Sequence, residues 1–380
     1  MKKKVKFLHI CRDDKFLRGV MSGFLQISNS ITSEFIILKP KNKKLKYGDE
    51  NELTVFVSRR LFKAKLKNGD YDAVYFHSLP PDNYWMINSI PKDKIVIWWS
   101  WGFDIYNGGI YGWNSFINVN SIKKETKTIQ NKSRTFYRKI VLFFCMLYYE
   151  LYGRLKRSAV LKRIDYFRPV LPAEYNMMKR NRSFRAGEFY PLNFGPNYHV
   201  KNDTKKAEGD IIIGNSGSAF NNHADVWYDI KDYLPGDRRI IVPLSYGTDR
   251  YAKKVKTIIT GNNVGFLDDF LPKEEYFDIM NNCSYAVYGS VRQHAMGNIN
   301  HALAEGIKVF LYKESVVYKS LKDMGFVVFA IEDIDSNSFS TPLNKEDLEK
   351  NEQAFDRLRE HASMVKNKAM NEIEMHINNL

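Results

Sequence analysis

The stretch Asp210-Ile-Ile-Ile-Gly-Asn-Ser-Gly-Ser218 decides how the second half of the chain folds. Three consecutive isoleucines form a short apolar run of the kind that is buried inside a parallel sheet, and a glycine-rich turn follows at once. A helical pattern begins at His223, so the segment reads as strand, turn and helix. The N–H groups of such a turn and of the helix behind it can bind phosphate. Because the turn matches neither the Walker pattern nor G-x-G-x-x-G, an ordinary glycine-rich turn is the alternative.

Runs of strand length alternate with helical patterns along the rest of the chain. This alternation predicts an α/β fold with two doubly wound, Rossmann-like parallel sheets, whose ligands bind at the carboxyl ends of the strands. The predicted strands are 5–11, 34–39, 54–58, 71–76, 95–100, 164–170, 188–193, 210–214, 239–244, 264–266, 285–288 and 308–312, and the predicted helices are 16–27, 59–67, 173–180, 223–231, 250–260, 273–281 and 298–305.

The length of 380 residues suggests two or three domains. We predict an N-terminal acceptor-binding domain over 1–200 and a C-terminal domain over 207–343, separated by a polar linker. The charged segment 344–380 favours a helix that returns and packs across the N-terminal domain. Two such domains facing a cleft would place ligand sites on both of its walls.

Lys and Arg outnumber Asp and Glu by 58 to 43, which gives a net charge of +15 and indicates an anionic partner. Thirteen of the basic residues, against three acidic ones, lie between 121 and 169. They flank an apolar, aromatic run at 140–152 that is too short to span a bilayer. We interpret the insertion at 121–163 as a helical hairpin that docks on an anionic membrane surface, the alternative being a buried helix with a solvated basic flank. The predicted docking residues are Arg138, Lys139, Phe143, Phe144, Arg154, Lys156 and Arg157.

The composition argues against several other kinds of protein. The three cysteines, Cys11, Cys145 and Cys283, are scattered, so they favour a reducing cytoplasm over a disulfide framework or a zinc site. The N-terminus reads as a strand, because Lys6 interrupts the apolar stretch that a signal peptide needs. Two Asp-x-Asp triplets, at 70–72 and 333–335, have the form of a metal site but are common by chance. We therefore expect no metal and no cofactor.

A second polar turn follows the predicted strand that ends at Tyr288. Arg292 in this turn could grip a diphosphate with two hydrogen bonds, the alternative being an ordinary surface salt bridge. Gly297 would let the N-terminus of the next helix approach the same ligand. Two anion-binding turns in one domain suit a nucleotide diphosphate. The predicted donor-binding residues are Gly214, Asn215, Ser216, Gly217, Ser218, Asn222, His223, Tyr246, Arg292, Gln293, Gly297 and Asn298.

Polar residues also follow three predicted strands of the first domain. They are His9 with Asp13 and Asp14, His77 with Ser78, and the block Trp101-Gly-Phe-Asp104. A carboxylate or imidazole in this position could deprotonate an attacking hydroxyl group, although each could equally cap a helix or close a turn. We predict that the general base is Asp104 or Asp14, with His77 as the third choice.

Four blocks resemble, in the same order, motifs of the bacterial TDP-4-acetamido-4,6-dideoxygalactose (4-acetamidofucose) transferase family, which builds enterobacterial common antigen on an undecaprenyl-diphosphate carrier. The blocks are Ile97-Trp-Trp-Ser-Trp-Gly-Phe-Asp-Ile-Tyr106, Gly214-Asn-Ser-Gly-Ser218 through Asn222-His223, Val242-Pro-Leu-Ser-Tyr246 and Arg292-Gln-His-Ala-Met-Gly297.

The resemblance covers roughly residues 5–330 and implies a GT-B fold, a nucleotide-sugar donor and an undecaprenyl-diphosphate-linked acceptor at the cytoplasmic face of the bacterial inner membrane. In that family's pattern Asp14, His77 and Asp104 match polar residues of the N-terminal domain. The block at Gly214 matches the presumed donor loop, and Arg292, Gln293 and Gly297 match the second one.

Our main hypothesis is a peripheral, metal-independent GT-B hexosyltransferase. It would move a 4-acetamidofucose-like sugar from TDP to a polyprenyl-diphosphate-linked oligosaccharide of a capsule, O-antigen or common antigen. A catalytically inactive scaffold of GT-B shape is one alternative. A basic nucleic-acid-binding protein is another, but such a protein should spread its basic residues among exposed aromatic ones, so we expect no nucleic-acid partner.

Overall fold

The computed structural model describes residues 4–14, 17–25, 31–49, 51–106, 116–117, 119–132, 136–190, 198–201 and 203–378. The chain divides into two compact units. The first comprises 1–118, 144–195 and 360–380, and the second comprises 119–143 and 196–359.

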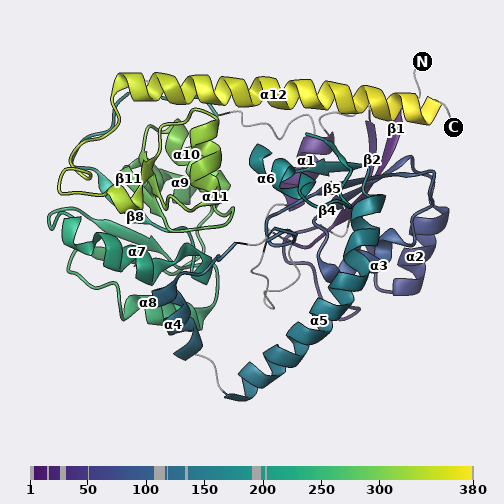
Figure 1. Cartoon of the computed structure of the whole chain (residues 1–380), viewed down its shortest axis with the longest axis horizontal. Coiled ribbons are helices and arrows are strands. Elements are labelled where there is room, and N and C mark those ends of the chain that lie inside the picture. Colours follow the sequence, from purple (N-terminus) through teal and green to yellow (C-terminus); the bar gives the residue numbers. More distant parts are fainter. Residues whose placement is uncertain are drawn as a thin grey trace. The chain divides into compact units, whose positions relative to one another are not determined.

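The first unit is built on a parallel sheet of seven strands in the order β3-β2-β1-β4-β5-β6-β7. Figure 1 shows β1, β2, β4 and β5 side by side. The central strands β4 and β5 are buried over their whole length, as continuous apolar runs of a parallel sheet should be. The strands are β1 (Val5–Cys11), β2 (Ile31–Leu38), β3 (Thr54–Phe56), β4 (Ala73–His77), β5 (Ile95–Trp99), β6 (Tyr166–Arg168) and β7 (Gly187–Glu188).

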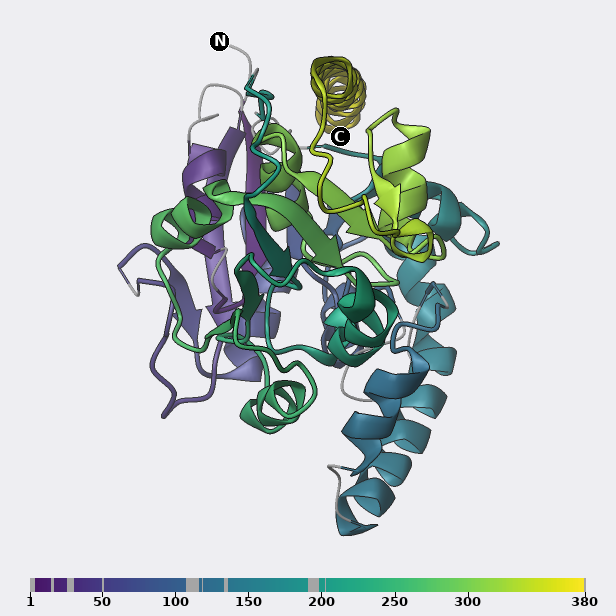
Figure 2. The ribbon, with the colours of Figure 1, turned by 90° about the vertical axis from the view of Figure 1, so that its left-hand side faces the viewer.

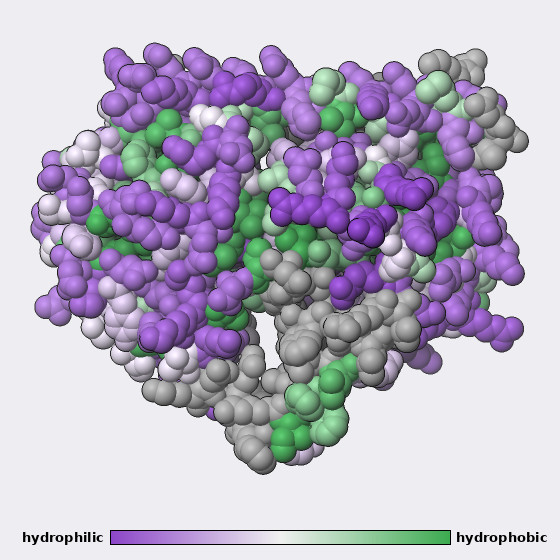
Figure 3. Space-filling view, viewed as in Figure 1, coloured by the Kyte–Doolittle hydropathy of each residue, from purple (hydrophilic) through white to green (hydrophobic). Residues whose placement is uncertain are grey.

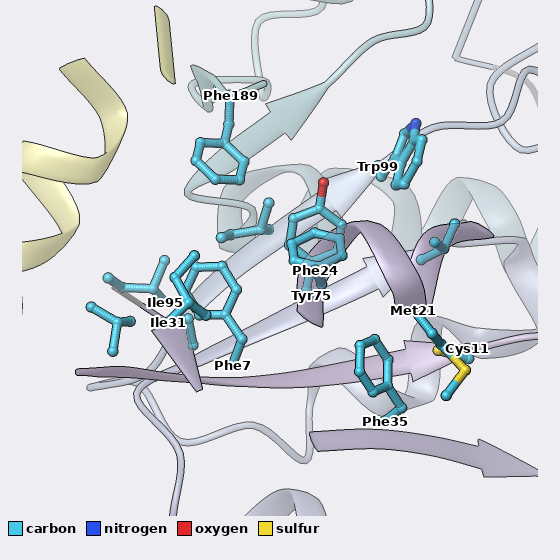
Figure 4. Packing of buried hydrophobic residues seen from close by; sticks show 14 of the residues in the cluster. Phe7, Cys11, Met21, Phe24, Ile31, Phe35, Tyr75, Ile95, Trp99 and Phe189 are labelled. Carbon is cyan, nitrogen blue, oxygen red and sulfur yellow. The ribbon is translucent and has the colours of Figure 1, made fainter. Parts of the chain in front are cut away.

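One face of this sheet carries an apolar core to which α1 contributes Met21 and Phe24 (Figure 4). The last helix of the chain adds Ala369, Met370 and Ile373 to the same core. Burying a side chain of this size is worth about 1.5–3 kcal/mol. The helices of the first unit are α1 (Leu17–Leu25), α2 (Arg59–Asn68), the 3-10 turn η1 (Pro81–Asn83), α3 (Tyr84–Ile87) and α6 (Pro172–Lys179).

The second unit repeats this plan with a parallel sheet of six strands in the order β10-β9-β8-β11-β12-β13. Its strands are β8 (Asp210–Ile213), β9 (Ile240–Pro243), β10 (Val264–Leu267), β11 (Cys283–Tyr288), β12 (Lys308–Leu311) and β13 (Phe329–Ala330). Its helices are α4 (Lys124–Lys132), η2 (Ala219–Asn221), α7 (His223–Ile230), η3 (Lys231–Tyr233), α8 (Asp249–Lys256), α9 (Lys273–Asn281), α10 (Met296–Ala304), α11 (Val316–Asp323) and η4 (Ile331–Asp333).

Two long helices contribute residues to both units. α5 (Phe136–Arg163) belongs to the second unit up to Phe143 and to the first unit from Phe144. α12 (Lys345–Asn378), which Figure 2 shows almost end-on, belongs to the second unit up to Arg359 and to the first unit beyond it.

The predicted α/β fold with two parallel, doubly wound sheets is confirmed. One strand is much shorter than predicted, because β7 has two residues and 191–197 lie outside the described residues. The boundaries of the units also differ from those that the sequence suggests. Residues 119–143, which we assigned to the N-terminal domain, belong to the second unit, and so do the first fifteen residues of α12.

Candidate functional site

In both sheets the order of the strands reverses at a point where the sequence predicts site residues. In the first unit, β1 leads to β2 and β3 on one side, and β4 to β7 lie on the other, so the order reverses between β1 and β4. In the second unit it reverses between β8 and β11. Ligands of doubly wound sheets bind at this switch point, beyond the carboxyl ends of the two strands. Each unit therefore has one expected ligand site of its own.

Gly214, directly after β8, begins the turn at the switch point of the second unit. Its φ of +74° lies in the left-handed region, which favours glycine. A Cβ atom at this position would lie 2.7 Å from Nε2 of His223. The turn therefore packs closely on the first residue of α7, which leaves no space for a larger residue.

Asn222 ties the turn to two other segments. Its side chain donates hydrogen bonds to the carbonyl oxygens of Gly289 (2.7 Å) and Ser121 (3.2 Å) and accepts one from the N–H of Lys123 (2.8 Å). Asn222 is fully buried and has a φ of +49°. Gly289 lies so close to Asn221 that a Cβ atom there would overlap the Asn221 carbonyl oxygen. Asn222 is thus held in place as a structural junction at the edge of the predicted donor site.

His223 presents a buried polar atom at the same switch point. Its Nδ1 lies 3.1 Å from the hydroxyl of Tyr251, whereas Nε2 has no hydrogen-bond partner among the described residues. Burial lowers the pKa of His223 to about 3, so the ring is neutral at pH 7. The hydroxyl of Ser290, after β11, is also buried and has no partner within the described ranges. Such atoms are expected where a ligand completes the hydrogen bonding.

Arg292 follows β11 and is 5% exposed. Its guanidinium lies 4.1 Å from the centre of the Phe220 ring, and its Nη1 donates to the carbonyl oxygen of Gln293 (3.1 Å). The alternative that we considered, an ordinary surface salt bridge, does not fit a side chain as buried as that of Arg292. The Phe220 ring packs against the guanidinium beside η2, which is a favourable contact for a cation.

The remaining predicted donor residues have different surroundings. Gly297 is exposed, with open space where a Cβ atom would lie, and Asn298 donates to the hydroxyl of Tyr276 (3.1 Å). Tyr246 is half-exposed after β9. Four others lie in the turn after β8, namely Asn215, Ser216, Gly217 and Ser218. In this turn the side-chain amide of Asn221 donates a hydrogen bond to the carbonyl oxygen of Ser216 (2.8 Å).

In the first unit, a small pocket lies at the switch point between β1 and β4. Arg12, Asp14, His77 and Trp101 line it together with the apolar residues Cys11, Leu17 and Val20. Asp14 is partly exposed there. The structure thus brings together two of the three residues that we predicted as general bases.

The neighbouring acid Asp13 has a structural role. Its carboxylate accepts hydrogen bonds from the backbone N–H groups of Lys46 (2.8 Å), Tyr47 (2.9 Å) and Gly48 (3.3 Å). Asp13 therefore anchors the loop that follows β2.

Asp104 is 2% exposed and accepts three hydrogen bonds. The donors are the N–H groups of Leu79 (2.9 Å) and Trp101 (2.8 Å) and the indole Nε1 of Trp98 (2.8 Å). Burial raises the pKa of this carboxyl group in spite of these donors. A general base has to reach the hydroxyl that it deprotonates. Asp104 therefore closes the Trp-Gly-x-Asp turn, and Asp14 is the more accessible of the two carboxylates.

The predicted docking segment exposes apolar side chains along α5. Exposed positions three and four residues apart form one stripe of the helix (Figure 3). Lys156 is also exposed, whereas Arg157 is partly buried and lies over the ring of Phe116. The side chains of Arg138, Lys139 and Arg154 lie outside the described residues. The exposed members of the stripe are Tyr137, Ile140, Val141, Phe144, Leu147 and Tyr148, with Phe143 at its edge.

Neither a spanning helix nor a metal cluster occurs in the part of the chain that the structure describes. No helix there is long and apolar enough to cross a bilayer, and no three His, Cys, Asp or Glu side chains gather as metal ligands. The first Asp-x-Asp triplet has structural partners, since Asp70 pairs with the amino group of Lys6 and Asp72 accepts its backbone N–H (2.9 Å).

Some residues of the two sites escaped the sequence analysis. Phe220 beneath Arg292 lies two residues beyond the quoted turn, and only its position beside that turn could have indicated its role. Ser33, which contacts His9 in the first unit, carries no signal, because it is an ordinary polar residue in a strand. Pairing between strands decides its neighbours.

Comparison with known proteins identifies what this architecture is similar to. A family described as 4-alpha-L-fucosyltransferase, glycosyl transferase group 56, matches residues 145–356. Among solved structures, an α,α-trehalose-phosphate synthase (UDP-forming) from Burkholderia vietnamiensis is 7% identical with a TM-score of 0.60, over 98% of this chain and 100% of that one.

Two further structures are similar over nearly their whole length. The sucrose-phosphate synthase from Thermosynechococcus elongatus is 10% identical with a TM-score of 0.57, over 99% of this chain and 98% of that one. A glycosyltransferase involved in avilamycin A biosynthesis is 11% identical with a TM-score of 0.52, over 98% of each chain. At such low identity the likeness shows the fold alone, which is GT-B.

Proposed function

Because the chain belongs to the 4-alpha-L-fucosyltransferase family, glycosyl transferase group 56, we propose that it moves a deoxy-acetamido sugar from a TDP donor to a polyprenyl-diphosphate-linked oligosaccharide. The membership agrees with the family resemblance seen in the sequence and makes the protein a glycosyltransferase. The acceptor class and the surface-polysaccharide pathway are the proposed part.

The observation that carries the proposal is the position of the candidate residues at the two switch points. In the second unit the turns after β8 and β11 are neighbours in the sheet, and they hold Gly214 and Arg292. Backbone N–H groups together with a guanidinium suit the two phosphates of a nucleotide diphosphate. Arg292 would stabilise the charge that develops on the departing diphosphate, so the transfer would need no metal ion.

In the first unit Asp14 would act as the general base. It would take the proton of the acceptor hydroxyl, whose oxygen then attacks the sugar carbon that carries the diphosphate. The bond between that carbon and the diphosphate breaks, and its electron pair leaves with the diphosphate. Trp101 and Arg12 line the small pocket beside Asp14, and an indole at its edge could pack on the apolar face of a sugar ring.

The exposed stripe of α5 supports a peripheral position on the cytoplasmic face of the bacterial inner membrane. An apolar stripe beside basic residues is typical of helices that lie in a bilayer interface. Docking there would raise the local concentration of a lipid-linked acceptor.

A transfer assay tests the proposal. The full-length protein is incubated in EDTA with TDP-4-acetamidofucose and a polyprenyl-diphosphate-linked amino-sugar acceptor, and mass spectrometry follows the acceptor. We expect the acceptor to gain one sugar. Asp14→Asn should lower kcat by about 10²–10⁴-fold, the usual contribution of a general base. If the protein binds TDP but transfers sugar from none of a panel of TDP-, UDP- and GDP-sugars, the inactive-scaffold alternative is correct.

A further inference from the structure

A hydrogen-bonded chain of three side chains crosses the sheet of the first unit. Nε2 of His9 lies 3.1 Å from the hydroxyl of Ser33, and Nδ1 of His9 lies 3.0 Å from Nε2 of His77. The strand register explains the chain, because His9 lies opposite Tyr75 in β4 and opposite Phe35 in β2. Ser33 and His77 are two residues to either side of those positions, so all three side chains lie on one face of the sheet.

This chain is enclosed by aromatic rings. The ring of His9 lies 4.3 Å from that of Phe24 and 4.5 Å from that of Phe35, measured between ring centres, and Tyr75 contacts both histidines. Burial lowers the pKa of His9 to about 3 and that of His77 well below its ordinary value. The nearby Arg168 guanidinium lowers the pKa of His77 further, as does the charge that His9 would carry if it were protonated. Both imidazoles are therefore neutral at pH 7.

A neutral imidazole carries one N–H and one bare nitrogen, so the chain can run in only two directions. In one, His77 donates to His9 and His9 donates to Ser33, which leaves Nδ1 of His77 bare. In the other, Ser33 donates to His9 and His9 to His77, which leaves Nδ1 of His77 with the proton. The direction of the hydrogen bond between Ser33 and His9 thus decides whether Nδ1 of His77 carries a proton.

That last nitrogen is on a residue that lines the pocket of Asp14. His77 lines the pocket, and since its Nε2 faces His9, Nδ1 is the only other polar atom of the ring. Nδ1 is buried and has no hydrogen-bond partner within the described ranges. Ser78, the next residue, has a φ of +79°. Backbone strain of this kind in a residue other than glycine is concentrated at functional sites.

We propose that Ser33 and His9 are positioning residues that keep the proton of His77 on Nδ1, where it donates a hydrogen bond to the oxygen of the acceptor hydroxyl. The inference rests on the proposed function, in which Asp14 takes the hydroxyl proton. The acceptor hydroxyl has a single proton, which it gives to Asp14. A second group that binds the hydroxyl oxygen therefore has to donate a hydrogen bond to it. An N–H beside the carboxylate of Asp14 is also electrostatically favourable, whereas a bare lone pair there is not.

Nuclear magnetic resonance tests the direction of the chain without any activity. Long-range proton–nitrogen spectra of the full-length protein, labelled with 15N in its histidines, report which ring nitrogen carries the proton. We expect Nδ1–H with a bare Nε2 for both His9 and His77, assigned by the signals that vanish in His9→Asn and His77→Asn. A proton on Nε2 of His77 would overturn the proposal and leave the proposed function standing.

A matched pair of variants tests the role in catalysis. Ser33→Thr keeps the hydroxyl at a strand position that tolerates threonine well, whereas Ser33→Ala removes it. We expect Ser33→Ala to raise KM for the acceptor by about tenfold, the effect of one hydrogen bond, and Ser33→Thr to restore it. Calorimetric binding of TDP should be the same in both variants. Equal KM values in Ala and Thr variants that both fold would contradict a positioning role.

A second pair of variants tests whether Nδ1 of His77 is the atom that contacts the acceptor. The amide of asparagine reaches about as far as Nδ1 of histidine, and the amide of glutamine about as far as Nε2. His77→Asn can therefore present an N–H to the pocket, whereas His77→Gln cannot. We expect the Asn variant to have the lower acceptor KM of the two. A Gln variant that performs as well as the Asn variant would exclude Nδ1 as the contact.

Discussion

Asp14 follows β1 and Asp104 follows β5, two strands that β4 separates in the sheet of the first unit, and the two carboxylates have different surroundings. The carboxylate of Asp104 is buried under three N–H donors, whereas Asp14 is partly exposed at a pocket. The sequence alone ranks them together, because the donors to Asp104 include Leu79, which lies 25 residues away. Burial and hydrogen bonding are therefore the reason why we propose Asp14, and not Asp104, as the general base.

Asp104→Asn should lower stability far more than it lowers catalysis. The amide group would bring its own N–H against one of the three donors and leave it unsatisfied, at a cost of about 1–3 kcal/mol. We expect a reduced melting temperature, measured by calorimetry, and a kcat within a few fold of the parent at a temperature where the variant is folded. If Asp104→Asn folds normally and loses kcat as Asp14→Asn does, Asp104 is the base.

His223 should make the second unit less stable in acid. Its pKa is about 3 in the folded protein and near 6.5 when unfolded, so only the unfolded state takes up a proton below pH 6.5. Its contribution to stability is present above pH 6.5 and is lost as the pH falls towards 3. At pH 5 the loss amounts to about 2 kcal/mol.

His223→Asn provides the test, because its amide can still reach the hydroxyl of Tyr251 but does not titrate. The variant should lose less melting temperature than the parent between pH 7 and pH 5. His9→Asn serves as a control, since His9 acts in the same direction but in the first unit. The explanation fails if the parent and His223→Asn show the same pH dependence.

At the scale of elements, strands and helices were predictable where local pattern determines them. Most strands of both sheets lie within a few residues of their predicted bounds, because buried apolar runs and turn residues mark them. It was not predictable that α4 belongs to the second unit. Both carboxylate oxygens of Asp225 accept the first N–H groups of this helix, from Glu125 (2.9 Å) and Thr126 (2.8 Å). A contact between residues about 100 apart leaves no trace in local sequence.

α5 carries the membrane-docking prediction. Phe144 is 63% exposed in the apolar stripe, and Phe270, at 61%, is an equally exposed phenylalanine outside it. We expect Phe144→Glu to reduce co-sedimentation with phosphatidylglycerol vesicles severalfold, because a charged side chain replaces a ring that would lie among the acyl chains. Phe270→Glu should bind the vesicles as the parent does. Equal losses in the two variants would show that net charge, and not the stripe, governs binding.

At the scale of the whole molecule, the two units share one plan and each has a switch point with candidate residues. The sheets were predictable in kind, and the sequence places the blocks at 97–106, 214–223 and 292–297 at or just after the ends of strands, where the structure has them. The partners of each side chain were not, because they depend on strand register and on packing, as with Phe220 beneath Arg292 and Ser33 beside His9. The sequence therefore predicts which segments lie at the ends of the strands better than it predicts the contacts that their side chains make.

The central claim is that the second unit binds a nucleotide diphosphate through Arg292. Isothermal titration calorimetry of TDP into the full-length protein, with EDTA present, tests it most directly. We predict binding that EDTA does not change, weakened about 10–100-fold in Arg292→Ala by the loss of charge-assisted hydrogen bonds. Arg239→Ala should bind TDP as the parent does. Arg239 is an exposed arginine at the amino end of β9, whereas Arg292 follows the carboxyl end of β11 in the same parallel sheet. Failure to bind TDP, or binding that Arg292→Ala leaves unchanged, would contradict the account.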